Sequence, residues 1–310
     1  MSDTRPILIA GPTASGKSAL ALRLAQALNG IVINADAMQV YRELRILTAR
    51  PDEAEMACAP HALYGFVPGG ESYSAGRYAA DVARVLTQAS REGRRPIIVG
   101  GTGLYFKTLV EGLSPMPAVP EDVRVHWRTR ALEEGAGALY VELAARDPVM
   151  AERLAPTDTQ RIVRALEVID SSGTSLAEWQ QAPRQPVLEL ADTIPLLVVH
   201  DRDELYRRID ARFLQMMDEG GLEEVMQLSR HGLAPDAPIM TALGVRPLLR
   251  HVAGELSREA AITAGQTETR QYAKRQLTWT RSNMIAWQII SAQEMQTTGA
   301  DLALFIQSAN

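Results

Sequence analysis

The first third of the chain alternates short, continuous apolar runs with longer segments of helical periodicity. The apolar runs cover residues 7–10, 31–35 and 96–99, the length and character of buried strands. Segments after them are rich in Ala and Leu or carry an apolar face, and we expect helices at residues 19–28, 74–91 and 104–111. Ser74 is placed to cap the second of these helices. This alternation predicts a parallel sheet covered by helices.

The pattern changes at residues 114–120, where Pro115, Pro117 and Pro120 mark a boundary. Residues 121–182 read as helices only, residues 193–200 form a further β-branched strand, and the rest reads as helix almost to the end. We therefore predict an α/β fold: a P-loop-type parallel sheet core of residues 1–116 and 186–310, interrupted by an all-helical insertion at residues 117–185. Residues 290–310 carry no interpretable signal.

Composition places the chain among globular proteins. It has 310 residues, 46% of them apolar, and a net charge of -5, which argues weakly against a general nucleic-acid coat. The polar residues 1–5 do not resemble a signal peptide, and the apolar runs are too short to span a membrane. Cys58 is the single cysteine, so no intramolecular disulfide can form. We expect a cytoplasmic protein with no membrane partner, acting as a monomer.

Residues 11–18 read GPTASGKS and match the phosphate-binding pattern G-x-x-x-x-G-K-[ST]. The expected strand before them and helix after them are the context this motif requires. Backbone N–H groups of such a loop and the positive helix end surround an anion. Lys17 adds a charge, and the Ser18 hydroxyl is suited to Mg²⁺. The residues we expect to bind phosphate are Gly11, Thr13, Ala14, Ser15, Gly16, Lys17 and Ser18.

Polar residues also end the second and third strands. Asp36 follows an apolar strand, where a carboxylate facing a phosphate loop suits a general base, although Asp is equally favoured as a helix N-cap. Thr102 lies in the turn Gly100-Gly101-Thr102-Gly103, where P-loop ATPases often carry a magnesium-binding Asp. The lack of an Asp at this position disfavours a kinase or a motor protein. Because the carboxyl ends of parallel strands share one edge, these residues and the loop predict a single site.

Two basic patterns lie on expected helices. Arg208 and Arg212 share one face of the helix expected at residues 203–217, where they could reach a cleft or pair with Glu204 and Asp210.

The segment from residue 270 to residue 281 carries four cations and no acidic residue, with Tyr272 and Trp279 interleaved. Cations with aromatics suit a single-stranded RNA loop. Gln160, Arg161 and Arg164 are weaker evidence, since Thr157 and Gln160 also fit a capping box.

Taken together, these motifs resemble the tRNA dimethylallyltransferases, also called tRNA isopentenyltransferases. The matching segments occur in the family's order between residues 11 and 281: GPTASGKS, NADAMQVYR, GGTGLYF, GLSP, QRIVRALEV and KRQLTWTR. Two positions depart from the family pattern. Ala37 stands where Ser is common after the Asp, and Val245 stands where Tyr is common.

The resemblance implies magnesium-assisted transfer of a dimethylallyl group from its diphosphate to the exocyclic amine of the adenine immediately 3′ of the tRNA anticodon. It implies that Asp36 is the general base, that Ser18 lies near the metal, and that Thr102 and Arg208 lie near the reacting groups. It also implies that the insertion grips the anticodon stem-loop. The implied tRNA contacts are Asp36, Ala37, Met38, Gln39, Thr102, Arg124, Gln160, Arg161, Ile162, Val163, Arg164, Arg246, Lys274, Arg275, Gln276, Trp279 and Arg281.

Two other functions use the same loop. A small-molecule or nucleotide kinase would take ATP as phosphoryl donor, and an ATP-dependent RNA-binding module would bind tRNA without modifying it. Both predict a nucleotide in the loop, where the prenyltransferase predicts the diphosphate of dimethylallyl diphosphate.

Overall fold

The computed structural model describes residues 4–116 and 118–291 and divides into two compact units. One comprises residues 1–110 and 187–310, and we call it the catalytic unit. The other comprises residues 111–186, and we call it the helical unit. The polar residues 1–3 and the segment 292–310 lie outside the described residues. Within the described part, no helix is both long and apolar enough to cross a bilayer.

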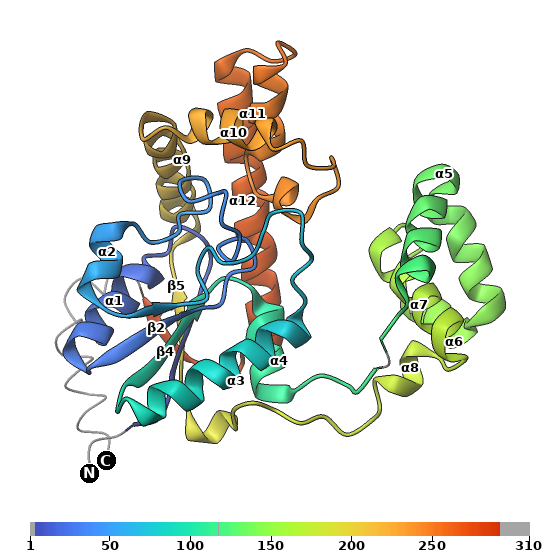
Figure 1. Cartoon of the computed structure of the whole chain (residues 1–310), viewed down its shortest axis with the longest axis horizontal. Helices are drawn as coiled ribbons and strands as arrows, with labels where there is room; N and C mark the ends of the chain where they lie inside the picture. The colour runs from blue at the N-terminus through green and yellow to red at the C-terminus, as the bar shows by residue number, and fades with distance from the viewer. Residues whose placement is uncertain (1–3, 117, 292–310) are drawn as a thin grey trace. The chain divides into compact units, whose positions relative to one another are not determined.

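The catalytic unit is built on a parallel six-stranded sheet in the order β3-β2-β4-β1-β5-β6. Figure 1 labels β2, β4 and β5 of this sheet. Its strands are β1 (Ile7–Ala10), β2 (Gly30–Asn34), β3 (His61–Ala62), β4 (Arg95–Gly100), β5 (Ile194–Val199) and β6 (Gln288–Ser291). The four central strands are almost continuously apolar because helices cover both faces. β1 lies between β4 and β5, so the loop that follows β1 begins near the middle of the carboxyl edge.

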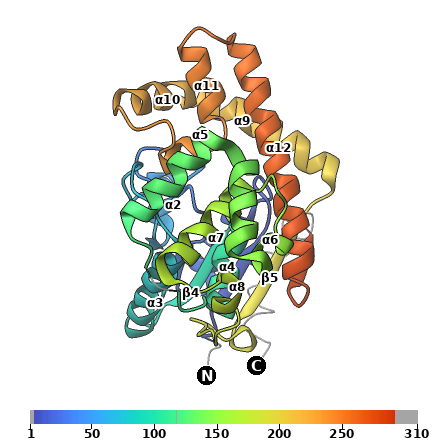
Figure 2. The same ribbon diagram turned by 90° about the vertical axis from the view of Figure 1, so that its right-hand side faces the viewer.

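Helices surround this sheet and extend beyond it (Figures 1 and 2). The longest, α12 (Arg258–Asn283), packs its first half against α9 and α11, and Figure 2 shows α9, α10 and α11 gathered at that end. The helices of the unit are α1 (Lys17–Ala27), α2 (Glu53–Cys58), α3 (Ala75–Arg91), α4 (Gly103–Glu111), α9 (Arg202–Asp218), α10 (Gly221–Arg230), α11 (Val245–Val252) and α12, with short 3₁₀ turns η1 (Leu190–Asp192) and η2 (Pro238–Thr241).

The predicted α/β class is confirmed, and three short elements were missed. The pattern did not indicate α2 and β3, and β6 was taken as helix or as uninterpretable sequence. All three are six residues or fewer, and β3 and β6 are edge strands whose partners come from distant sequence. Ser74 caps α3 as expected, accepting a hydrogen bond from the Arg77 amide.

The helical unit contains α5 (Glu121–Arg146), α6 (Pro148–Arg153), α7 (Thr159–Ser172) and α8 (Leu176–Trp179). α5 is interrupted at Gly135, whose φ of 77° breaks the helix into two arms. Trp127 is fully buried and donates from Nε1 to Asp170 Oδ2 at 3.2 Å, while Arg130 and Arg146 lie over its ring. The unit thus has its own core and its own polar network.

The helical unit spans residues 111–186, and the predicted insertion spanned residues 117–185. One sequence-based detail of this unit needs correction. The N-cap of α7 is Asp158, which accepts from the Arg161 amide at 3.3 Å, and Thr157 is not the capping residue.

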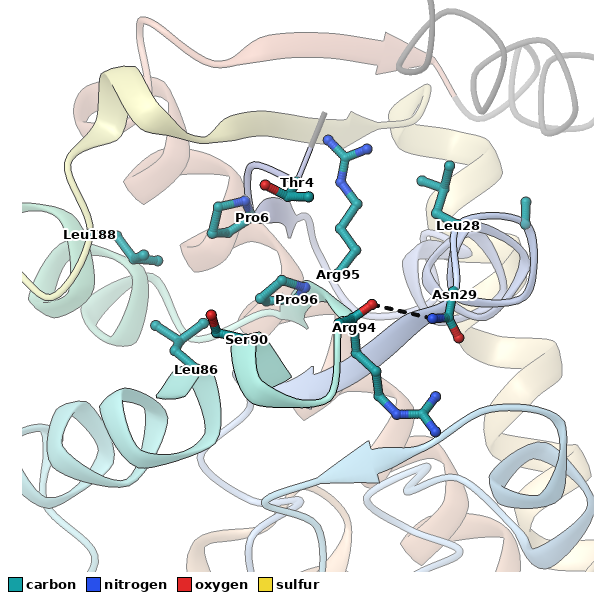
Figure 3. Close-up of a pocket in the computed structure, with 12 residues that line it drawn as sticks. Thr4, Pro6, Leu28, Asn29, Leu86, Ser90, Arg94, Arg95, Pro96 and Leu188 are labelled. Carbon is teal, nitrogen blue, oxygen red and sulfur yellow. Dashed lines mark hydrogen bonds between the residues drawn. The ribbon is translucent and has the colours of Figure 1, made fainter. Parts of the chain in front are cut away.

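A cavity of about 790 Å³ opens at the amino edge of the sheet (Figure 3). Pro6, Arg95 and Pro96 line it where β1 and β4 begin, and Asn29 donates to the Gly93 carbonyl at its rim. In parallel α/β sheets ligands bind at the carboxyl edge. This cavity is therefore separate from the phosphate loop.

Candidate active site

The phosphate loop joins β1 to α1, and two of its residues have positive φ angles, which glycine adopts more easily than other residues. Gly16 has φ 84° and is the N-cap of α1, and Ala14 also has a positive φ of 61°. Lys17 Nζ donates to the Pro12 carbonyl at 3.0 Å. Burial lowers the pKa of Lys17 to about 8, helped by Arg212 and opposed by Asp36. The loop is preformed, and its lysine lies in a poorly hydrated place where an anionic ligand would be favoured.

Arginines from α9 complete the surroundings of this loop. Arg208 Nε donates to the Ala14 carbonyl at 3.0 Å. Arg208 and Arg212 line a cavity of about 410 Å³ together with Lys17 and Ser18. Burial lowers the pKa of Arg212, and the nearby Glu55 opposes that shift. The cavity therefore gathers cationic groups from two helices around backbone N–H groups, which suits a diphosphate.

The alternative of a solvated charged face is not what the structure shows for these two arginines. Glu204 pairs with Arg207 at 2.6 Å, and Asp210 pairs with Arg270. Arg208 and Arg212 instead point to the cavity. Residue 207 lies on a different face of α9 from residues 208 and 212.

Asp36 and Thr102 lie next to each other at the carboxyl edge. Thr102 Oγ1 accepts from the Ala37 amide at 2.9 Å, and Asp36 Oδ1 accepts from the Met38 amide at 2.9 Å. No helix follows Asp36 among residues 37–50, so the N-cap interpretation is wrong. The strand ends of β2 and β4 therefore bring the two predicted residues together.

Asn34, which sequence reasoning passed over, holds the Asp36 backbone in place. Its fully buried side chain accepts from the Asp36 amide at 2.8 Å and donates to the carbonyls of Asp36 and Leu63 at 2.9 and 3.0 Å. A buried amide with this many partners fixes a turn rigidly. Its signal in the sequence was an Asn at the end of an apolar strand.

The charge of Asp36 acts on three tyrosine side chains. Burial, and then the charge of Asp36, raise the pKa values of Tyr64 and Tyr272, and burial with Tyr41 and Asp36 does the same for Tyr105. These phenols remain neutral throughout the physiological range. They come from three separate parts of the chain, so sequence spacing could not reveal the group.

The carboxyl-terminal half of α12 lies against the Gly-Gly-Thr-Gly turn. A Cβ added at Gly103 would lie 2.2 Å from the Trp279 ring, and one at Gly101 would lie 2.2 Å from Gln276 Nε2. The lack of a side chain at Gly101 and Gly103 therefore leaves room for Gln276 and Trp279 of α12. Trp279, Tyr272 and Gln276 line a cavity of about 230 Å³ with the turn, while Lys274, Arg275 and Arg281 are exposed.

The segment after Asp36 is fixed by a carboxylate from α10. Glu224 accepts from the amides of Arg45, Ile46 and Leu47 at 2.6, 2.9 and 3.0 Å. Gln39 is bound within the same loop, donating to the carbonyls of Thr48 and Ala49. Sequence reasoning missed Glu224, because three consecutive amides on one carboxylate depend on a turn that the pattern did not predict.

Several residues expected to contact tRNA have a different place in the structure. Ile162 and Val163 are buried in the core of the helical unit, and the Gln276 side chain is 7% exposed and bonded inside the catalytic unit. Their side chains are largely buried and have structural partners within their own units. The apolar character of Ile162 and Val163 had already indicated core.

The basic residues expected to contact tRNA are at the surface. Arg161 and Arg164 pair with Asp158 and Glu167 within α7 and its cap, and Arg124 pairs with Glu121 at 3.6 Å. Gln160 is also exposed. In the catalytic unit, Arg246 at the start of α11 lines a cavity with Arg275 of α12. Each unit therefore presents cationic side chains.

The described residues contain no group of three or more His, Cys, Asp or Glu arranged to hold a metal ion. The phosphate-binding motif after the first strand, with arginines from α9 lining the same cavity, places the chain among the P-loop-type α/β proteins.

Comparisons with known proteins identify the family. The family model described as IPP transferase matches residues 39–283, and the one described as isopentenyl transferase matches residues 5–62. A tRNA dimethylallyltransferase of Parvibaculum lavamentivorans is 48% identical over 302 residues, 97% of this chain and 96% of its own length. One from Agrobacterium fabrum is 51% identical over 278 residues, covering 90% and 93%.

Solved structures agree. The tRNA isopentenylpyrophosphate transferase of Bacillus halodurans superposes with a TM-score of 0.70 at 31% identity, covering 98% of this chain and 95% of that one. A eukaryotic dimethylallyltransferase acting on tRNA gives a TM-score of 0.79 at 28% identity, covering 96% and 77%. The chain belongs to the IPP transferase family of tRNA dimethylallyltransferases.

Proposed function

We propose that this protein transfers a dimethylallyl group from dimethylallyl diphosphate to the exocyclic amine of the adenosine immediately 3′ of the anticodon, position 37 of tRNA, and releases diphosphate. Family membership over nearly the whole chain supports transfer of a prenyl group to tRNA. The observation that carries the finer proposal is the pairing of a phosphate cavity with Asp36 at the same sheet edge.

The diphosphate would occupy the cavity lined by Lys17, Ser18, Arg208 and Arg212. When the allylic C–O bond breaks, negative charge grows on the departing diphosphate. Cations and backbone N–H groups already in place stabilise that charge without reorganising. A leaving group is the chemistry that such a cavity favours.

Asp36 would accept the proton that the exocyclic amine loses as its nitrogen bonds to the allylic carbon. An adenine amine is a poor nucleophile, so both proton removal and exact placement increase the rate. The hydrogen bonds of Asn34 and Thr102 to residues 36 and 37 hold the carboxylate near one position. The base must leave the stack of the loop to reach it, at a cost of about a few kcal/mol.

Magnesium fits this cavity through the Ser18 hydroxyl and the oxygens of a bound diphosphate. Ser18 is exposed on the cavity wall, and Mg²⁺ usually keeps several waters and binds substrate phosphates with few protein ligands. The ion would supply Lewis-acid stabilisation of the departing diphosphate.

A kinase is the second candidate, and the sheet edge argues against it. β4 ends in Gly100-Gly101-Thr102-Gly103, with no carboxylate at the position where many P-loop enzymes hold magnesium. The exposed cations of α12 also have no role in a small-molecule kinase.

Mass spectrometry of tRNA separates the candidates. Unmodified tRNA is incubated with the protein, dimethylallyl diphosphate and magnesium, and parallel reactions contain [γ-³²P]ATP or EDTA. A dimethylallyl mass increase at adenosine 37 that EDTA abolishes is expected. Transfer of the γ-phosphate would establish the kinase, and tRNA binding without any product would establish the RNA-binding module.

A cytoplasmic location and a monomeric state complete the proposal. The single exposed Cys58 is consistent with a reducing compartment. Light scattering on a size-exclusion column and cell fractionation test the two statements separately.

A further inference from the structure

Gln276 of α12 bridges two parts of the site that lie far apart in sequence. Its Oε1 accepts from the Thr13 amide of the phosphate loop at 2.9 Å, and its Nε2 donates to the Gly101 carbonyl at 2.9 Å. The backbone amide can only donate and the carbonyl can only accept, so these partners fix the orientation of the side-chain amide. The side chain is 7% exposed, which strengthens both bonds.

The two backbone groups that Gln276 binds lie beside the two parts of the proposed active site, the phosphate cavity and the general base. Thr13 precedes Ala14, Gly16, Lys17 and Ser18, which line the phosphate cavity. Gly101 precedes Thr102, whose hydroxyl accepts from the Ala37 amide beside Asp36. A single side chain therefore links the loop that would bind the leaving diphosphate to the turn beside Asp36, the proposed general base.

Among the described residues, two further side chains from outside the phosphate loop bond to its backbone carbonyls, and they come from different elements. Arg208 of α9 donates to the Ala14 carbonyl, and His200 Nε2, at the end of β5, lies 3.0 Å from the Ser15 carbonyl. Gln276 is the tie from the helix that carries the exposed cations Lys274, Arg275 and Arg281.

We propose that Gln276 is a positioning residue that aligns the phosphate loop with the Thr102 turn, and that it serves transfer of the prenyl group without contacting tRNA. The inference rests on the proposed function. It assigns to a buried member of the basic helix a role different from that of its exposed neighbours.

The test compares Gln276→Met, which keeps length and removes both bonds, with Gln276→Glu, which keeps the acceptor for Thr13 but places a carboxylate against the Gly101 carbonyl. Gln227→Met, an exposed glutamine on α10, is the matched control. The measurements are the tRNA dissociation constant, the KM for dimethylallyl diphosphate, and the single-turnover rate at saturation.

For both Gln276 variants we expect a single-turnover rate about ten- to a hundredfold lower, because a buried donor or acceptor loses its partner and the reacting groups shift. Affinity for tRNA should match the wild type and the control. Compared with the wild type, amide hydrogen exchange in the peptide that contains Thr13 should be faster in Gln276→Met and slower in Gln276→Glu. A purely structural defect would instead lower tRNA affinity and the melting temperature together.

Weaker tRNA binding with an unchanged rate at saturation would overturn the inference, since Gln276 would then be a tRNA contact. An unchanged rate, KM and exchange pattern would overturn it as well. Titration of magnesium and inorganic pyrophosphate provides a readout that needs no transfer, and we expect about tenfold weaker binding in Gln276→Met. Wild-type protein that binds pyrophosphate but forms no dimethylallyl product would refute the proposed function and leave this binding comparison intact.

Discussion

The catalytic unit and the helical unit are stabilised in different ways. In the catalytic unit, single polar side chains such as Asn34, Glu224 and Gln276 each bind two or three backbone groups. In the helical unit, ion pairs and ring contacts join side chains to one another around Trp127. The proposed reaction in the catalytic unit requires backbone turns that are held in place. The cations of the helical unit require only stable helices to carry them.

Removal of the proposed base should have the largest effect. Asp36→Ala is expected to lower the single-turnover rate of prenyl transfer by about 10²- to 10⁴-fold while tRNA affinity is retained. Asp236→Ala, an exposed carboxylate in the same unit, is the control. Near-normal transfer by Asp36→Ala would mean that another group accepts the proton.

Truncation of Trp127 tests whether the two units are energetically separate. Trp127→Ala removes the largest fully buried side chain of the helical unit, and we expect a loss of about 3–5 kcal/mol in that unit's stability. Limited proteolysis should then cut within residues 111–186, while pyrophosphate binding by the catalytic unit persists. Loss of both together would show that the units unfold as one.

Arg212 sharpens the assignment of the phosphate cavity. Arg212→Ala should lower kcat/KM for dimethylallyl diphosphate about ten- to a hundredfold, with tRNA affinity unchanged, because a cation facing the diphosphate is lost. Arg207→Ala, which removes the neighbour paired with Glu204, is the control. An equal effect in both variants would point to a general loss of charge.

The exposed cations of α12 should give the smallest effects. Lys274→Ala and Arg281→Ala are each expected to weaken tRNA binding several-fold and to make its salt dependence shallower by about one unit of slope. Lys107→Ala, a cation on α4, is the comparison. Unchanged affinity and slope in both α12 variants would remove this face from the interface.

The positions of the phosphate loop, Asp36 and Thr102 in the fold could be predicted from sequence because their motifs are local. GPTASGKS contains the loop, the lysine and the hydroxyl in consecutive positions, and Asp36 and Thr102 each follow an apolar strand. Parallel strands then place them at one edge. The position of Gln276 could not be predicted in this way, since the same helix turns exposed Lys274 outward and Gln276 inward, and amphipathic polar residues look alike in sequence.

Periodicity and contiguous residues were enough to predict the alternation of strands and helices, the phosphate-binding motif and the family. The burial of polar side chains against backbone groups emerged from the fold: Asn34 binds the Asp36 backbone, Glu224 binds three amides, and Gln276 links the loop to the turn. The physical reason is that a buried hydrogen bond depends on where a distant backbone group lies, and no local pattern contains that distance.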